Sequence, residues 1–155
     1  MVLDAAFQDI TIRGQSLRIG GFDGYYRYWG MRAKDKAQAE AEEAFADAFE
    51  DTERFKLLLN HIPTVWTDWG NIHKFPVDLV LSGHYHGGQI RLPVGLYAPY
   101  VGFFPKNTEG LFAGETANCI LSTGLSASPG IPRINNLPQV VVVDLLPENE
   151  KEVLT

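Results

Sequence analysis

Two histidines separated by one residue follow an apolar run in the middle of the chain. The run 77–82 is typical of a buried strand, and it stops at Gly83, directly before His84 and His86. Neutral imidazole is the commonest metal-ligating side chain near neutral pH. In an extended chain, residues i and i+2 point to the same side about 6–7 Å apart, which suits two metal ions about 3.5–4 Å apart. A lone histidine beside glycines is more often a turn residue, but the full string from Gly83 to Gln89 is more restrictive and favours metal.

A third histidine, His61, follows a second apolar run at 55–60. Between the two runs, apolar residues at 65–72 have the spacing of a short helix, so we expect a strand-helix-strand unit with parallel strands. Ligand sites lie outside the carboxyl ends of such strands. His61 and His84 occupy these two ends and are expected to meet, whereas His73 lies in the connection and is expected to be exposed or capping.

The remaining chain predicts an α/β fold with a mixed β-sheet and flanking helices. We expect one scaffold helix at 33–51, because Ala, Glu, Lys and Gln predominate there and the apolar residues follow helical spacing. Short strands are expected elsewhere: a hairpin over 7–19 with its turn at 14–15, a strand at 89–92, an antiparallel pair at 109–113 and 118–122, and a final buried strand at 140–145.

Several segments allow more than one interpretation. Asp23 lies among glycines and is either a turn former or a residue that reaches the site, the former being commoner. The aromatic stretch 25–29 is either a packing cluster or a stacking surface. The apolar loop 97–104 is a lid or acyl-chain contact, or it covers the core.

Composition excludes some function classes. The 155 residues are 45% hydrophobic and 21% charged, as in ordinary globular domains, with a formal charge of −6. Binding to a nucleic-acid backbone needs a basic surface and is not expected. One cysteine, Cys119, forms no internal disulfide. No apolar run approaches the ~20 residues of a membrane span, so we expect a soluble chain, cytoplasmic or membrane-peripheral.

The residues around the paired histidines carry a resemblance to a known family. Gly83-His84-Tyr85-His86 resembles the last metal-binding motif of the calcineurin-like metallophosphoesterases, and the longer match over 78–93 resembles a bacterial, often membrane-associated subgroup. Residues 57–63 and 122–140 are similar to neighbouring family segments. The resemblance covers nearly the whole chain, but only the carboxyl-terminal half of the family's four-layer α-β-β-α sandwich.

This resemblance implies hydrolysis of phosphate mono- or diesters at two divalent metal ions, Mn, Fe or Zn. His61 and His84 would bind one ion and His86 the other, while a metal-activated water attacks phosphorus. Asp23 and Arg133 are candidates for the substrate pocket.

The sequence departs from the family in its carboxylate motifs. No Asp lies two residues before any histidine, no Gly-Asp pair occurs, and residues 70–73 read Gly-Asn-Ile-His where the family has Gly-Asn-His. No catalytic residue is therefore identified. We expect this chain alone to bind one metal weakly and to hydrolyse little. The alternative is a non-catalytic binding module or an inactive fragment with a vestigial metal site.

The resemblance also implies how the chain is organised. Residues 1–147 are expected to form the carboxyl-terminal half of the domain, followed by an acidic tail at 148–155. Such a half exposes an apolar face or edge. The expected partners are a phosphoester substrate and either the amino-terminal half or a second copy, with membrane contact only through segments outside this chain or the 97–104 loop.

Overall fold

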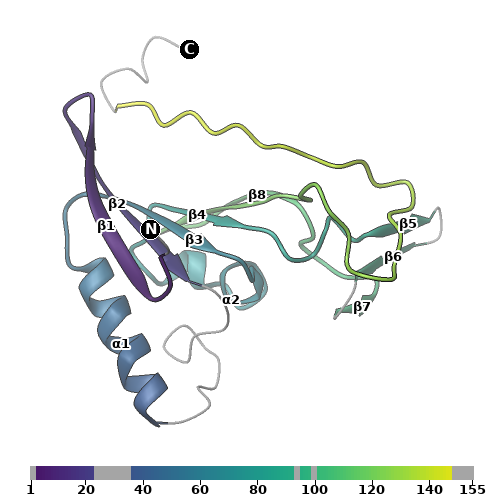
Figure 1. Cartoon of the computed structure of the whole chain (residues 1–155), viewed down its shortest axis with the longest axis horizontal. Helices are drawn as coiled ribbons and strands as arrows, with labels where there is room; N and C mark the ends of the chain where they lie inside the picture. Colours follow the sequence, from purple (N-terminus) through teal and green to yellow (C-terminus); the bar gives the residue numbers. More distant parts are fainter. Residues whose placement is uncertain (1–2, 23–35, 93–94, 99–100, 148–155) are drawn as a thin grey trace.

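The computed structural model describes residues 3–22, 36–92, 95–98 and 101–147, which form an α/β fold built on a mixed sheet (Figure 1). Within these residues, six strands pair in the order β1-β2-β3-β4-β9-β8, and β5-β6-β7 form a separate small sheet. The elements are β1 Ala6–Ile12, β2 Gln15–Phe22, α1 Lys36–Glu50, β3 Phe55–Asn60, α2 Thr64–Thr67, the 3₁₀ helix η1 Asn71–His73, β4 Leu79–Ser82, β5 Ile90–Leu92, β6 Gly95–Ala98, β7 Gly102–Phe103, β8 Gly110–Ala113 and β9 Asn118–Leu121.

The expected amino-terminal hairpin is confirmed as β1 and β2, but its turn lies one residue earlier than expected, because Ile12 is already opposite Gln15. The two turn residues between them, Arg13 and Gly14, have φ of +50° and +80°. Positive φ at both central residues is the geometry that matches the twist of paired strands.

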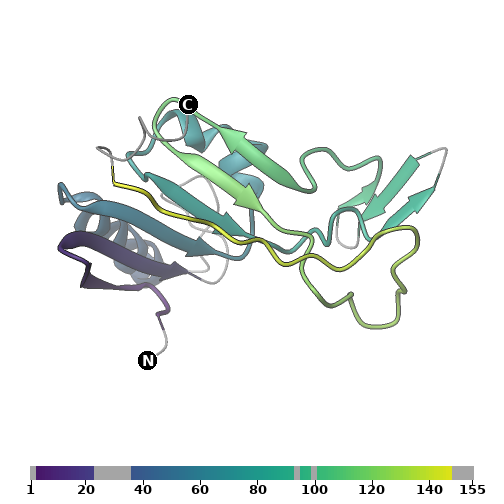
Figure 2. The same cartoon turned by 90° about the horizontal axis from the view of Figure 1, so that it is seen from above.

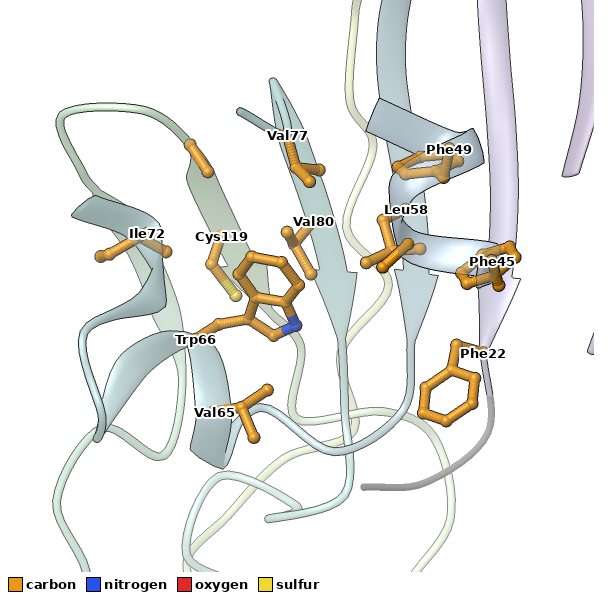
Figure 3. Packing of buried hydrophobic residues seen from close by; sticks show 12 residues of the cluster. Phe22, Phe45, Phe49, Leu58, Val65, Trp66, Ile72, Val77, Val80 and Cys119 are labelled. Atoms are coloured by element: carbon orange, nitrogen blue, oxygen red, sulfur yellow. The ribbon is translucent and has the colours of Figure 1, made fainter. Parts of the chain in front are cut away.

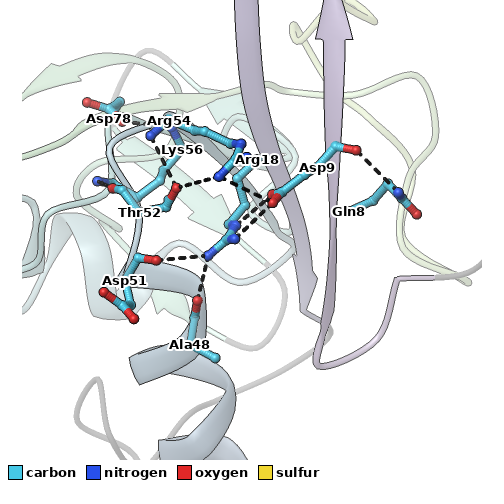
Figure 4. Close-up of polar contacts among 9 residues, drawn as sticks. All are labelled: Gln8, Asp9, Arg18, Ala48, Asp51, Thr52, Arg54, Lys56 and Asp78. Carbon is cyan, nitrogen blue, oxygen red and sulfur yellow. Dashed lines mark hydrogen bonds and ion pairs between the residues drawn. The ribbon is translucent and has the colours of Figure 1, made fainter.

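The Arg18 side chain joins this hairpin to the carboxyl end of α1 (Figure 4). Arg18 donates to both carboxylate oxygens of Asp9, at 2.7 and 2.9 Å, and to the Ala48 carbonyl at 2.6 Å. The same guanidinium lies 4.2 Å from the centre of the Phe7 ring. One side chain therefore ties together both strands of the hairpin and the last turn of the helix.

Parallel pairing in the middle of the sheet positions the histidines. Strand β3 is parallel to β2 and to β4, and β4 is parallel to β9. This confirms the expected strand-helix-strand unit, in which the connection contains α2 and η1. The two are separated at Gly70, whose φ of +72° a continuous helix does not accept.

The hydrophobic core lies on the side of the sheet that α1 and α2 cover (Figure 3). Phe45 and Phe49 of α1 stack with ring centroids 5.7 Å apart over the β2–β3 side, and the buried Trp66 of α2 covers the β4–β9 side. The backbone of Gly20 passes so close to Phe49 that a Cβ there would lie 2.6 Å from the ring. The fully buried residues of this face include Leu58, Val80 and Cys119, one on each of three neighbouring strands.

The opposite face of the sheet carries no helix among the described residues. Leu59, Leu81, Ile120 and Leu111 are paired in one row across four strands, and the exposed fractions of Leu59 and Leu111 are 42% and 68%. The segment 137–147 passes along this side (Figures 1 and 2).

The predicted buried strand at 140–145 is wrong. These residues form no regular secondary structure, and Val140 and Val142 are 72% and 82% exposed. The valine-rich sequence favours a strand, but the segment runs over the face of the sheet rather than beside an edge strand, where ladder hydrogen bonds are available (Figure 2).

The expected loop after 92 is also partly wrong. Strands β6 and β7 follow β5, and the three form an antiparallel meander at the end of the molecule away from α1 (Figures 1 and 2). Tyr97 packs against Phe103 across it, with ring centroids 5.1 Å apart. The prolines and glycines in this stretch interrupt the alternating pattern by which strands are predicted from sequence.

Among the described residues, no helix is long and apolar enough to cross a bilayer.

Candidate metal site

His61 and His84 lie at the carboxyl ends of β3 and β4, which pair in parallel up to Leu59 and Leu81. The backbone links the two ends, because the Gly83 N–H donates to the His61 carbonyl at 3.1 Å. One residue earlier, the Ser82 hydroxyl donates to the Asn60 carbonyl at 2.7 Å. Both chains therefore leave the sheet in a fixed relation to each other.

The two imidazole rings meet directly. Nδ1 of His84 is 3.3 Å from Nε2 of His61, and the ring planes are inclined by 81°. Two ring nitrogens that share a tetrahedral ion at about 2.0–2.1 Å are separated by about 3.3–3.4 Å. The separation of the two nitrogens therefore fits one shared metal ion. Without metal, the same separation allows a hydrogen bond between the rings.

The surroundings of His84 favour its neutral form. Burial lowers the pKa of His84, and the neighbouring His61 and His86 rings lower it further. A neutral ring retains the lone pair that a metal ligand needs.

His86 belongs to the same loop but does not complete a three-ligand group. Burial is the largest cause that lowers the pKa of His86, and the nearby Arg133 and His61 lower it further. A hydrogen bond with the Ser126 backbone raises it. Within the described residues, no group of three or more His, Cys, Asp or Glu side chains converges closely enough to hold one ion. The structure thus brings His61 and His84 together and leaves His86 near them.

The extended conformation expected of His84 and His86 is wrong. Their φ angles are +72° and +50°, so both residues are left-handed within a tight turn that continues through Gly87 and Gly88. Left-handed backbone is costly for residues other than glycine and persists where neighbours enforce it.

Tyr85 is one residue whose contacts hold this turn in place. Its side chain is 3% exposed, and its hydroxyl lies 2.6 Å from Oγ1 of Thr64 and 3.3 Å from a carboxylate oxygen of Asp68. The residue between the two histidines is thereby fixed to α2 and the residue that follows it.

Later residues hold the other side of the loop. The Asn136 amide donates to the His86 carbonyl, and the fully buried Gln89 accepts from the Ser128 N–H and donates to the Ile131 carbonyl. These contacts join the histidine loop to the chain some 40–50 residues downstream. Sequence reasoning singled out neither Tyr85 nor Asn136, because neither has a motif that marks such a contact.

The two substrate-pocket candidates have different outcomes. Arg133 lies near enough to His86 to affect its pKa, but its guanidinium donates to the carbonyls of Thr123, Gly124, Ser126 and Leu137. In this structure it fastens the 123–137 loop. Asp23 lies outside the described residues, as do the aromatic stretch 25–29 and the acidic tail 148–155.

A pocket of about 500 Å³ opens beside His61 at the carboxyl ends of β2, β3 and β4. Asn60 lies in its wall and is itself buried, accepting from the Trp66 indole at 2.8 Å and donating to the Phe22 carbonyl. The pocket is lined by Leu3, Gly21, Phe22, Leu59, Asn60, His61, Leu81, Ser82 and Gly83. Polar groups therefore gather at the strand ends, and three leucines, Phe22 and two glycines form the rest of the lining.

Two curated proteins of Bacillus subtilis (strain 168) are similar to this chain. It is 32% identical over 97 residues to the uncharacterized metallophosphoesterase YkuE, and 30% identical over 88 residues to the uncharacterized metallophosphoesterase YkoQ. The alignments cover 61% and 56% of this chain and 32% of each relative. No protein-family model matches the chain, and no solved structure matches it significantly.

The similarity to two metallophosphoesterases agrees with the paired histidines at the strand ends. The chain is therefore similar to metallophosphoesterases over part of its length, and it spans about a third of the length of the curated relatives it matches.

Proposed function

We propose that this chain is the carboxyl-terminal part of a metal-dependent phosphoesterase that hydrolyses phosphate mono- or diesters. The observation that carries the proposal is the 3.3 Å separation of the His61 and His84 ring nitrogens at the ends of adjacent parallel strands. The similarity to two metallophosphoesterases supports the same conclusion. Residues 1–147 would form the carboxyl-terminal half of a calcineurin-like sandwich. The six-stranded sheet would be one of the two sheets of that sandwich.

In this proposal, His61 and His84 hold one divalent ion and His86 contributes to a second. A divalent metal, when bound, supplies a Lewis acid that activates water and stabilises charge on the phosphoryl oxygens. Imidazole ligands suit Mn, Fe and Zn alike when carboxylates complete the set. The chain's own contribution is to orient the rings, to lower the pKa of His84 so that its neutral form is favoured, and to fix the loop through Tyr85.

The isolated chain should hydrolyse little. No Asp-x-His or Gly-Asp pair occurs in its sequence, so it offers none of the carboxylates those motifs contribute to a dinuclear site. Asp23 and Arg133 remain proposed substrate contacts. The second candidate function is a non-catalytic module with a vestigial metal site, which the same absence of carboxylate motifs favours.

Turnover of a bis-aryl phosphate with added Mn tests the proposal. We expect negligible hydrolysis by the 155-residue chain, and metal-dependent hydrolysis when its natural upstream sequence is included. Robust hydrolysis by the 155 residues alone would contradict the half-site assignment. Tight metal binding without hydrolysis in the extended protein would instead support the non-catalytic module.

A further inference from the structure

The turn that carries His86 is held by side chains from outside the histidine loop. The carbonyl of His86 accepts a hydrogen bond from the Asn136 amide, and the carbonyl of Gly87 accepts one from Nε of Arg91 at 2.8 Å. A peptide carbonyl needs a partner, and the donor that satisfies it also fixes the direction of the peptide. The two peptide groups directly after the His86 Cα therefore have their orientation set by Asn136 and by Arg91.

Gly87 and Arg91 are in close contact. A Cβ atom at Gly87 would lie 2.7 Å from Nη2 of Arg91 and 2.5 Å from Cγ2 of Thr123, which is closer than real Cβ atoms approach other atoms. The φ of Gly87 is +64°, which also favours glycine. One residue after His86, the backbone thus lies directly against the guanidinium, and a shift of the guanidinium would shift the loop with it.

Glu109 orients the guanidinium of Arg91. Nη2 of Arg91 forms an ion pair with the Glu109 carboxylate. Nε and Nη2 share one edge of the planar guanidinium, so one rigid group binds the Gly87 carbonyl and the Glu109 carboxylate side by side. Glu109 directly precedes β8, which pairs with β9 of the main sheet. The ion pair therefore connects the histidine loop to the sheet.

The backbone of Arg91 is fixed as well. Its N–H donates to the Ile134 carbonyl at 2.9 Å, and its carbonyl accepts from the Asn135 amide at 3.1 Å. Arg91 is thereby anchored both at its backbone and at the end of its side chain. The guanidinium is a fixed point against which the loop is placed.

We propose that Arg91 is a positioning residue for His86. Its guanidinium, oriented by Glu109, fixes the Gly87 peptide and thereby sets where the His86 ring lies relative to the paired rings of the metal site. The inference rests on the proposed function, in which His86 contributes to a second ion, and it names the residue that places this ligand.

The alternative is an ion pair that has no effect beyond the surface. The side chains of Arg91 and Glu109 are 29% and 40% exposed, and pairs of this kind contribute little to global stability. The two interpretations predict different effects of Arg91→Lys. A lysine keeps the positive charge beside Glu109, but its single ammonium lacks two parallel donors at a fixed spacing. The His86 ring moves in this variant only if the guanidinium positions it.

NMR of the histidine rings tests the positioning. Ring ¹H–¹³C spectra of the 155-residue chain are recorded in EDTA at about pH 8.5, where histidine rings of ordinary or lowered pKa are neutral. The four ring signals are assigned with single His→Ala variants. We expect Arg91→Lys and Arg91→Gln to move the His86 signal by more than its linewidth and to leave the His73 signal in place. Arg54→Gln is the matched control, because Arg54 pairs with Asp9 at 3.6 Å beside the amino-terminal hairpin, and it should move none of the four signals.

Glu109→Gln covers the case in which the Arg91 variants fold poorly. It removes the ion pair but keeps the hydrogen bond to Gly87, so the His86 signal should move in the same direction by a smaller amount. Its urea midpoint should stay close to that of the wild type, because the pair is partly exposed.

An unmoved His86 signal in Arg91→Lys would overturn the inference, because charge alone would then be sufficient. An equal movement of the His73 signal would also overturn it, since the change would then be general. If the Arg91 variants do not fold, an unmoved His86 signal in Glu109→Gln has the same consequence. All of these spectra are recorded without metal, so failure of the wild type to bind Co²⁺ would contradict the proposed function and leave their outcome unchanged.

Discussion

Replacing Tyr85 by Phe isolates the contact that holds the histidine loop. The change removes one hydroxyl and leaves the buried ring in place. The hydroxyl lies 2.6 Å from Thr64 Oγ1 and 3.3 Å from Asp68. A neutral hydrogen bond contributes about 0.5–1.5 kcal/mol, and the longer contact to the exposed Asp68 adds little after screening. We therefore expect the free energy of unfolding to fall by about 0.5–1.5 kcal/mol.

Urea unfolding followed by circular dichroism measures this loss as a lower midpoint at constant slope. Tyr97→Phe is the control, because that ring lies in the small sheet against Phe103, and it should change stability by less than about 0.5 kcal/mol. Thr64→Val combined with Tyr85→Phe should give a coupling energy of about 0.5–1.5 kcal/mol in a double-mutant cycle. Additive effects, or a Tyr85→Phe variant as stable as the wild type, would refute the idea that this hydroxyl fixes the loop.

Three further predictions follow from the packing and charge of the chain. Phe49→Ala should lower the free energy of unfolding by about 3–5 kcal/mol in the same urea assay, because Phe49 is fully buried; a loss below about 1 kcal/mol would show that the α1 face is poorly packed. Arg18 lowers the pKa of Asp9 below its usual 3.8, so the carboxylate stabilises the fold above that pH and the contribution is lost as pH falls through the folded-state pKa. The difference in urea midpoint between wild type and Asp9→Asn should therefore be constant above about pH 5 and shrink below about pH 4, and a constant difference throughout would contradict this. The helix-free face, with Leu59 and Leu111 exposed, should make the chain self-associate, and light scattering that finds only monomer at high concentration would count against it.

Local patterns were sufficient to predict the central strands and the position of two histidines. The apolar runs before His61 and His84, separated by one helical stretch, required a parallel pair with both rings at one edge. The left-handed backbone at His84 and His86 could not be predicted, because the glycines nearby indicate a turn without indicating which residues take positive φ.

Contacts between distant segments were also beyond the sequence patterns. Asn136 reaches the His86 carbonyl across 50 residues, and a single asparagine in a loop gives no sign of its partner. The strand prediction for 140–145 was wrong for a related reason. Its valines favour a strand, but a strand also needs a free sheet edge with which to pair.

Cobalt binding is the most direct test of the paired-histidine site, because Co²⁺ reports its ligands through visible absorption. The wild-type chain should bind Co²⁺ with an absorption band that Zn²⁺ displaces, and His61→Ala and His84→Ala should each weaken binding at least about tenfold. His73→Ala is the matched control, because His73 accepts from the Glu115 N–H in a different part of the fold. Unchanged Co²⁺ affinity in both site variants, or an equal loss in His73→Ala, would contradict the assignment.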